Sequence, residues 1–164
     1  MPLKAKPTLD IEALAETHYD AVWQFCYRRV GTSHAADATQ DTFLTALRRK
    51  DTFRGDAEPR IWLFGIAHNV CRNLRRAHKP ESPLADHAEP GDMVDTLHTR
   101  GTLVTALERL SPEHREVVVL HELDSLTYGE ISAVLGVPTG TVKSRLHHAF
   151  LSLRKILGPM EALK

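Results

Sequence analysis

The chain has 164 residues, of which 42% are hydrophobic and 26% charged, as is typical of one ordinary or two small soluble domains. Its 21 Lys and Arg balance its 21 Asp and Glu, which excludes a uniformly basic or acidic protein. We find no apolar run near the ~20 residues that cross a bilayer and no signal-peptide core, so we expect no membrane insertion. Cys26 and Cys71 are too few for a disulfide framework, and a cytoplasmic location is therefore expected.

Helical periodicity in the first half of the chain predicts three helices, over about residues 10–30, 34–49 and 59–77. Gly31 should end the first helix, Thr32 and Ser33 should cap the second, and Pro59 suits the first turn of the third. The side chains predicted to face inward are Leu14, Val22, Phe25, Cys26, Ala35, Thr39, Thr42, Phe43, Ala46, Leu47, Trp62, Leu63, Ile66, Val70 and Leu74.

The composition changes over residues 80–101, which contain three prolines, five acids and few large apolar residues. This predicts an acidic linker with a helix beginning near its end. Further helices are expected to begin near Leu103 and at Ser111-Pro112, and a last one should run to Ile156. The chain is therefore expected to be all-α, with a second domain over residues 102–158.

Residues 126–146, LTYGEISAVLGVPTGTVKSRL, have the pattern of a helix, a tight turn and a second helix. Thr127 and Glu130 form a capping box, Gly136 suits the left-handed end of a helix, and Thr139 can cap the helix that follows. Ser132 is small where two crossing helices must approach each other. This layout is that of a helix-turn-helix whose second helix enters the DNA major groove. The side chains left for its outer faces are Thr141, Lys143, Ser144, Arg145 and His148.

The charges are unevenly distributed along the chain. Residues 54–79 contain six Lys or Arg and two acids, and residues 139–157 contain four Lys or Arg and no acid. A helix that lies among phosphates excludes carboxylates, whereas an ordinary solvated helix mixes both signs. Two basic patches separated by an acidic segment therefore predict two DNA-facing surfaces.

With these features the sequence resembles a known family, the extracytoplasmic-function (ECF, group 4) RNA polymerase sigma factors of the sigma-70 family. The first half is similar to sigma region 2, and the second half, with LERLSPEHREVVVL and GEISAVLGVPTGTVKSRL, is similar to sigma region 4. The motifs that carry the first resemblance are Asp37, Gln40, Thr42-Phe43, Phe53-Arg54-Gly55, Trp62-Leu63 and Ile66-Ala67-His68-Asn69.

The resemblance implies two small helical domains, a region 2-like bundle over residues 10–79 and a region 4-like helix-turn-helix domain over residues 102–158, joined by the linker 80–101. It also implies a protein that is not an enzyme and needs no cofactor or metal. Such a protein binds core RNA polymerase and directs promoter-specific transcription initiation by recognising the minus-thirty-five and minus-ten elements and assisting melting. The implied partners are the clamp and flap regions of the polymerase, promoter DNA and an anti-sigma factor.

By the same resemblance, site residues can be assigned to three surfaces. Polymerase binding falls to Asp37, Gln40 and Asp41. Contacts to the minus-ten element fall to Arg54, Gly55, Asp56, Asn69, Arg72, Arg75 and Arg76. Contacts to the minus-thirty-five element fall to Thr139, Gly140, Thr141, Lys143, Ser144, Arg145 and His148. Trp62 lies on the inward stripe of its helix, so we expect core packing there rather than stacking on a base.

Two other classes fit part of the sequence. A stand-alone helix-turn-helix regulator accounts for residues 103–157 but leaves the basic third helix without a role. A metalloprotein would account for the ten histidines. However, His121-Glu122 lacks the second His of an HExxH motif, and His68 with Cys71 more simply forms a surface imidazole beside a buried thiol.

Overall fold

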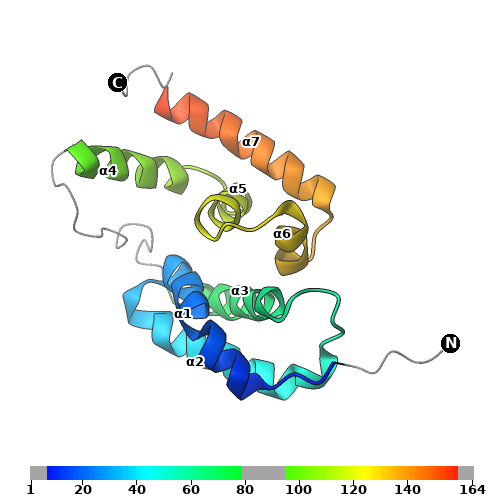
Figure 1. The fold of residues 1–164 in the computed structure, drawn as a ribbon. Helices are drawn as coiled ribbons and strands as arrows, with labels where there is room; N and C mark the ends of the chain where they lie inside the picture. The colour runs from blue at the N-terminus through cyan, green and yellow to red at the C-terminus, as the bar shows by residue number, and fades with distance from the viewer. Residues whose placement is uncertain (1–6, 79–94, 159–164) are drawn as a thin grey trace. The chain divides into compact units, whose positions relative to one another are not determined.

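The computed structural model describes residues 7–78 and 95–158, which form helices and connecting turns, with no strand in these two ranges. The contacts divide the chain into two compact units (Figure 1). The first contains α1 (Ile11–Val30), α2 (Thr32–Arg49), the short 3-10 helix η1 (Lys50–Thr52) and α3 (Pro59–Ala77). The expected all-α fold is confirmed. None of the helices in the described ranges is long and apolar enough to span a bilayer.

The helix ends of the first unit follow from local chemistry. The Asp10 carboxylate accepts hydrogen bonds from the N–H groups of Glu12 and Ala13, at 3.1 and 3.2 Å, and so satisfies two donors at the start of α1. Gly31 ends α1 with φ of 74°, a left-handed value that favours glycine. Its N–H donates to the Tyr27 carbonyl. The expected Thr32 and Ser33 caps are wrong, because α2 begins at Thr32 with Gly31 as its N-cap and has no side-chain cap.

The core of the first unit lies between α1, α2 and α3, each of which packs on the other two. Phe25 and Phe64 stack with their ring centroids 4.6 Å apart. The two thiols meet in this core, where a hydrogen bond from Cys71 lowers the pKa of Cys26 against the opposing effect of burial. The side chains buried at the centre of the three helices include Val22, Phe25, Cys26, Ala35, Ala38, Thr39, Thr42, Ala46, Leu63, Ala67 and Cys71.

The predicted inward face of α2 is correct for its small residues and wrong at one end. Ala35, Thr39, Thr42 and Ala46 are buried, but half of the surface of Leu47 is exposed. Small side chains bring α2 close to its two neighbours, and the Thr39 and Thr42 hydroxyls donate within the helix to the carbonyls of Ala35 and Ala38, at 2.7 Å. This close approach leaves no room for a second row of large side chains on the same face.

The second unit contains α4 (Asp95–Glu108), α5 (Pro112–Val118), the π-helical turn η2 (Val119–Leu123), most of α6 (Tyr128–Leu135) and α7 (Thr139–Leu157). Helix α4 begins at Asp95, which agrees with the helix expected near the end of the segment 80–101. Residues 79–94 lie outside the described ranges. The core of this unit is aliphatic and includes Ala106, Leu110, Val117, Leu120, Leu126, Ile131, Val142, Leu146, Ala149 and Leu153.

Most of the predicted helix-turn-helix chemistry is present. The Thr127 hydroxyl accepts from the N–H of Glu130 at 3.2 Å, the Glu130 carboxylate accepts from the N–H of Thr127 at 2.8 Å, and Gly136 is left-handed with φ of 67°. The Ser132 hydroxyl donates to the Val137 carbonyl at 2.6 Å, so it braces the turn as well as being small. The expected Thr139 cap is wrong, because Thr139 is already helical and α7 starts without a side-chain cap.

Candidate nucleic-acid interface

Helix α3 gives the first unit a basic surface. One face of this helix is buried in the core, and between Pro59 and Ala77 the helix contains no acid. Asn69, Arg72 and Arg76 are exposed and Arg75 is half-buried. This helix therefore carries an amide with both a donor and an acceptor together with three guanidinium groups, a combination that can contact base edges and phosphates.

The loop between η1 and α3 contains the other candidate residues of this surface. Arg54, Gly55 and Asp56 are exposed. Gly55 has φ of 79°, and a Cβ at this position would lie 3.1 Å from the Cγ of Pro7, so the loop requires glycine here. Phe53 is buried and meets the half-buried Trp62 edge-to-face, with ring centroids 5.4 Å apart. Trp62 thus anchors the loop to α3, which agrees with the expected packing role.

Helix α7 gives the second unit its basic surface. Val142, Leu146, Ala149 and Leu153 recur at helical spacing and fix one face in the core. On the other faces Thr139, Gly140, Lys143, Ser144 and His148 are exposed, whereas Thr141 is half-buried. The helix contains no acid. Its exposed face is therefore suited to a polyanion.

Arg145 is less exposed than expected for a residue on the outer face of α7. Its side chain is only 25% exposed, and its Nη2 atom lies 3.8 Å from Oε2 of Glu113, on the first turn of α5. The sequence pattern placed Arg145 on an outer face because it does not belong to the buried stripe of α7. A contact from a different helix is not visible in that pattern, which is why Glu113 is missed.

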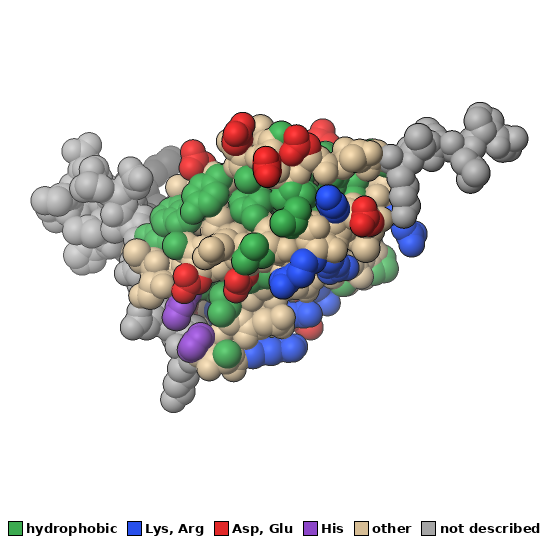
Figure 2. Space-filling view, turned by 90° about the horizontal axis from the view of Figure 1, so that it is seen from below, with side chains coloured by type: hydrophobic (Ala, Val, Ile, Leu, Met, Phe, Trp, Pro, Cys, Tyr) green, Lys and Arg blue, Asp and Glu red, His purple; other side chains and the backbone are tan. Residues whose placement is uncertain are grey.

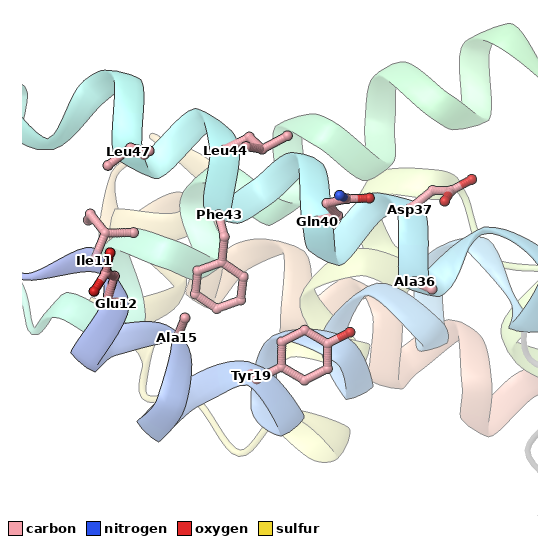
Figure 3. A pocket seen from close by; sticks show the side chains of 10 residues that line it. All are labelled: Ile11, Glu12, Ala15, Tyr19, Ala36, Asp37, Gln40, Phe43, Leu44 and Leu47. Atoms are coloured by element: carbon pink, nitrogen blue, oxygen red, sulfur yellow. The ribbon is translucent and has the colours of Figure 1, made fainter.

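The candidate polymerase-binding residues lie on α2. Asp37, Gln40 and Asp41 are all exposed. Asp37 and Gln40 also line a groove of about 530 Å³ between α1 and α2 (Figure 3). Figure 2, in which α1 and α2 face the viewer, shows a band of hydrophobic side chains with acidic side chains along one edge. The residues that line this groove are Ile11, Glu12, Ala15, Tyr19, Ala36, Asp37, Gln40, Phe43, Leu44 and Leu47.

Sequence reasoning found the polar part of this groove and missed its apolar part. Leu44 is 47% and Leu47 50% exposed, although large aliphatic side chains favour burial. The signal was present in the spacing, since Asp37, Gln40, Leu44 and Leu47 recur every three or four residues along one face of α2. The surface therefore combines hydrogen-bonding groups with apolar contact area, as protein interfaces do.

One histidine has a structural role. Nδ1 of His121 lies 3.0 Å from the Leu126 carbonyl oxygen, so a proton on Nδ1 makes the ring a donor that braces the turn before α6. In the first unit, His34 and His78 stack with their ring centroids 4.8 Å apart. No group of three or more His, Cys, Asp or Glu side chains in the described ranges is arranged to hold a metal ion.

Two family models match the chain in the order of its two units. Sigma-70 region 2 matches residues 14–81, and Sigma-70 region 4 matches residues 100–153. The first match covers most of α1 with all of α2 and α3, and the second covers the helix-turn-helix with most of α4 and α7.

Curated relatives are similar over almost their whole length. The ECF RNA polymerase sigma factor SigW of Bacillus subtilis is 32% identical, over 88% of this chain and 87% of the relative. The ECF RNA polymerase sigma factor SigL of Mycobacterium tuberculosis is 31% identical, over 90% of this chain and 88% of the relative.

Solved structures share the fold. CnrH, solved in complex with the cytosolic domain of CnrY, aligns with a TM-score of 0.67 and 26% identity, over 90% of this chain and 86% of that chain. The sigma factor RpoE of Bartonella quintana, solved with the anti-sigma factor NepR, aligns with a TM-score of 0.68 and 24% identity, over 90% of this chain and 96% of that chain.

Proposed function

Since this chain belongs to the ECF RNA polymerase sigma factors, we propose that its two basic surfaces read the two elements of one promoter while its first unit is bound to core polymerase. The chain directs promoter-specific transcription initiation, and the stand-alone regulator is not favoured. The observation that carries the proposal is the presence of an acid-free helix, α3 or α7, in each of two units that match the two sigma regions in order. The polymerase supplies the catalysis, and this chain supplies binding and specificity.

The surface of α3 and the loop before it is assigned to the minus-ten element. Melting exposes unpaired bases, and holding one of them out of the stack costs a few kcal/mol. Asn69 can donate to and accept from a base edge, and Arg72 and Arg76 can hold the phosphates on either side. Arg54, Gly55 and Asp56 are exposed on the loop and form the other part of this surface.

The exposed face of α7 is assigned to the minus-thirty-five element. Thr139, Gly140 and Thr141 form the first turn of the helix. The Thr141 N–H donates to the Pro138 carbonyl at 2.9 Å, so the attraction of phosphate to this helix start falls to the N–H groups of Thr139 and Gly140. Lys143, Ser144 and His148 follow as exposed donors one and two turns further on. This order suits a recognition helix that enters the major groove with its N-terminal half.

The groove between α1 and α2 is assigned to the clamp of the largest polymerase subunit, with the flap region as the partner of the second unit. Asp37 and Gln40 in the groove, with Asp41 exposed beside them on α2, supply carboxylates and an amide that suit Arg side chains. Leu44 and Leu47 supply apolar area. CnrH is solved with a second protein, the cytosolic domain of CnrY. We assign a protein partner to this chain as well, of the anti-sigma class, and a cytoplasmic location, where it meets polymerase.

The proposal is tested by transcription in vitro with purified core polymerase on genomic fragments, with and without this chain. New start sites that need the chain, and co-elution of chain and polymerase, are expected. A variant in which Asp37 and Gln40 are replaced by Ala should lose both the new start sites and the co-elution with polymerase. Its far-UV circular dichroism should stay unchanged, which shows that the variant still folds. If the wild-type chain gives no new start site, the proposal is wrong. Protection of a palindromic site without polymerase would instead identify a regulator.

A further inference from the structure

The first turn of α5 lies beside the middle of the candidate recognition helix. The Glu113 carboxylate is 3.8 Å from the Arg145 guanidinium, and the two side chains are 70% and 25% exposed. A second contact is formed by the next residue of α5 and a residue one turn further along α7. There the rings of His114 and His148 are stacked at 21°, with centroids 6.3 Å apart. The two contacts show that the first turn of α5 lies against the middle of α7.

Glu113 lies on the first turn of α5, where the helix dipole favours an acid, but it also lies beside a helix that is proposed to meet DNA. Phosphates repel a carboxylate, and α7 itself contains no acid between Thr139 and Leu157. At 3.8 Å the pair attracts through charge but is too long for a direct hydrogen bond, so the guanidinium donors stay available for another acceptor. Glu113 therefore biases where Arg145 lies without occupying its hydrogen-bonding groups.

We propose that Glu113 is a positioning residue, which holds the Arg145 guanidinium in the orientation that reads a base of the minus-thirty-five element and withholds it from phosphates. Bidentate contact with guanine requires a guanidinium plane of fixed orientation, whereas a phosphate accepts a cation from many directions. Partial neutralisation by Glu113 weakens the attraction to phosphate and leaves the base contact. This inference rests on the proposed function and assigns Arg145 to base reading.

The test uses the full chain, bound to core polymerase, on a pool of promoter fragments that carry every single base-pair substitution in the minus-thirty-five element. With the wild-type chain, substitution of a base pair that is read should lower initiation by ~5- to 150-fold. Arg145→Ala identifies the pair that Arg145 reads, because substitution of that pair then has no effect. Glu113→Gln is expected to lower discrimination at this same pair at least ~3-fold and to leave the other pairs unchanged.

The control Glu122→Gln removes the same charge elsewhere in the second unit, beside His121, and should leave discrimination unchanged. Arg145→Lys keeps the charge but loses the planar guanidinium group. It should therefore lower discrimination at the same base pair as Glu113→Gln. In the Arg145→Ala background, Glu113→Gln should have no further effect.

The inference is overturned if Glu113→Gln keeps the wild-type pattern, or if it lowers discrimination equally at all pairs. If the wild-type chain itself directs no initiation, the proposed function fails and the inference fails with it. These two failures are distinguishable, because the first occurs with a wild-type chain that initiates normally and the second does not.

Discussion

Three arginines show how position decides the role of one residue type. Arg29 is 3% exposed, with its guanidinium 3.5 Å from the centre of the Phe25 ring and a hydrogen bond of 2.9 Å to the Phe25 carbonyl, so it belongs to the core. Arg145 is partly buried beside Glu113, and Arg72 is exposed on α3. Only Arg72 has the accessibility that a simple phosphate contact requires.

At the residue scale, we predict that Asn69→Ala impairs opening of the minus-ten region more than it impairs binding of the promoter. The amide is exposed on α3, and its loss removes hydrogen bonds to a base that is available only after melting. Permanganate reactivity of bubble thymines should fall several-fold, while closed-complex binding in a gel-shift assay changes less than twofold.

The matched control for this variant is Asn73→Ala, which removes an exposed amide one helical turn further along α3. It should leave permanganate reactivity near the wild-type level. Equal losses in the two variants would show that melting depends on the general polarity of α3 and not on a base contact by Asn69.

At the element scale, α6 is a short helix whose two ends are both fixed by local chemistry. Its eight residues are fewer than an isolated helix needs in water, so caps and packing must hold it. The reciprocal Thr127–Glu130 bonds close the start, and the left-handed Gly136 closes the end. At the turn between α6 and α7 itself, the left-handed Gly136 is joined by the hydrogen bond from the Ser132 hydroxyl to the Val137 carbonyl.

We predict that Thr127→Ala lowers the free energy of unfolding of the second unit by about 1 kcal/mol, because the N–H of Glu130 loses its partner. Both tryptophans, Trp23 and Trp62, belong to the first unit. Urea unfolding followed by tryptophan fluorescence should therefore be unchanged, while part of the transition in far-UV circular dichroism moves to lower urea.

The control for this prediction is Thr105→Ala. The Thr105 hydroxyl donates to the Gly101 carbonyl inside α4 and satisfies no donor at a helix start. Alanine also has the higher helix propensity, so stability should stay level or rise slightly. A fluorescence transition that shifts together with the dichroism transition in Thr127→Ala would contradict the idea that the two units unfold separately.

At the scale of the whole molecule, the cationic surface is divided between two units of a chain with no net charge. Each unit can neutralise only a few phosphates, and each phosphate contact contributes to affinity in a salt-dependent way. We predict that the isolated chain binds a promoter duplex at least ~100-fold more weakly than the complex with core polymerase, since the polymerase turns two weak contacts into one two-site interaction.

Fluorescence anisotropy of a labelled promoter duplex in ~0.15 M salt measures both affinities. A duplex with scrambled minus-thirty-five and minus-ten elements serves as the control. The complex should bind this duplex no more tightly than core polymerase alone does. Comparable affinities of the isolated chain and of the complex for the promoter would contradict the division of binding between the two units.

The sequence by itself determined those features that depend on neighbours along the chain. The Thr127–Glu130 capping box, the left-handed Gly136, Pro59 at the start of α3 and the buried stripe of α7 all follow from side chains three or four residues apart. Local hydrogen bonds and helical periodicity act over that distance, so the helices and the two basic faces were predictable.

Only the tertiary structure decided which of two apolar stripes on α2 is buried, and which partner Arg145 meets. Ala38, Thr39 and Thr42 let α1 and α3 approach closely, so Leu44 and Leu47 are left on the surface and line a groove. Glu113 is 32 positions from Arg145 along the chain (145 − 113), and the packing of α5 on α7 brings them together. Periodicity shows that a face exists, but the shape of the neighbouring helices decides what covers it.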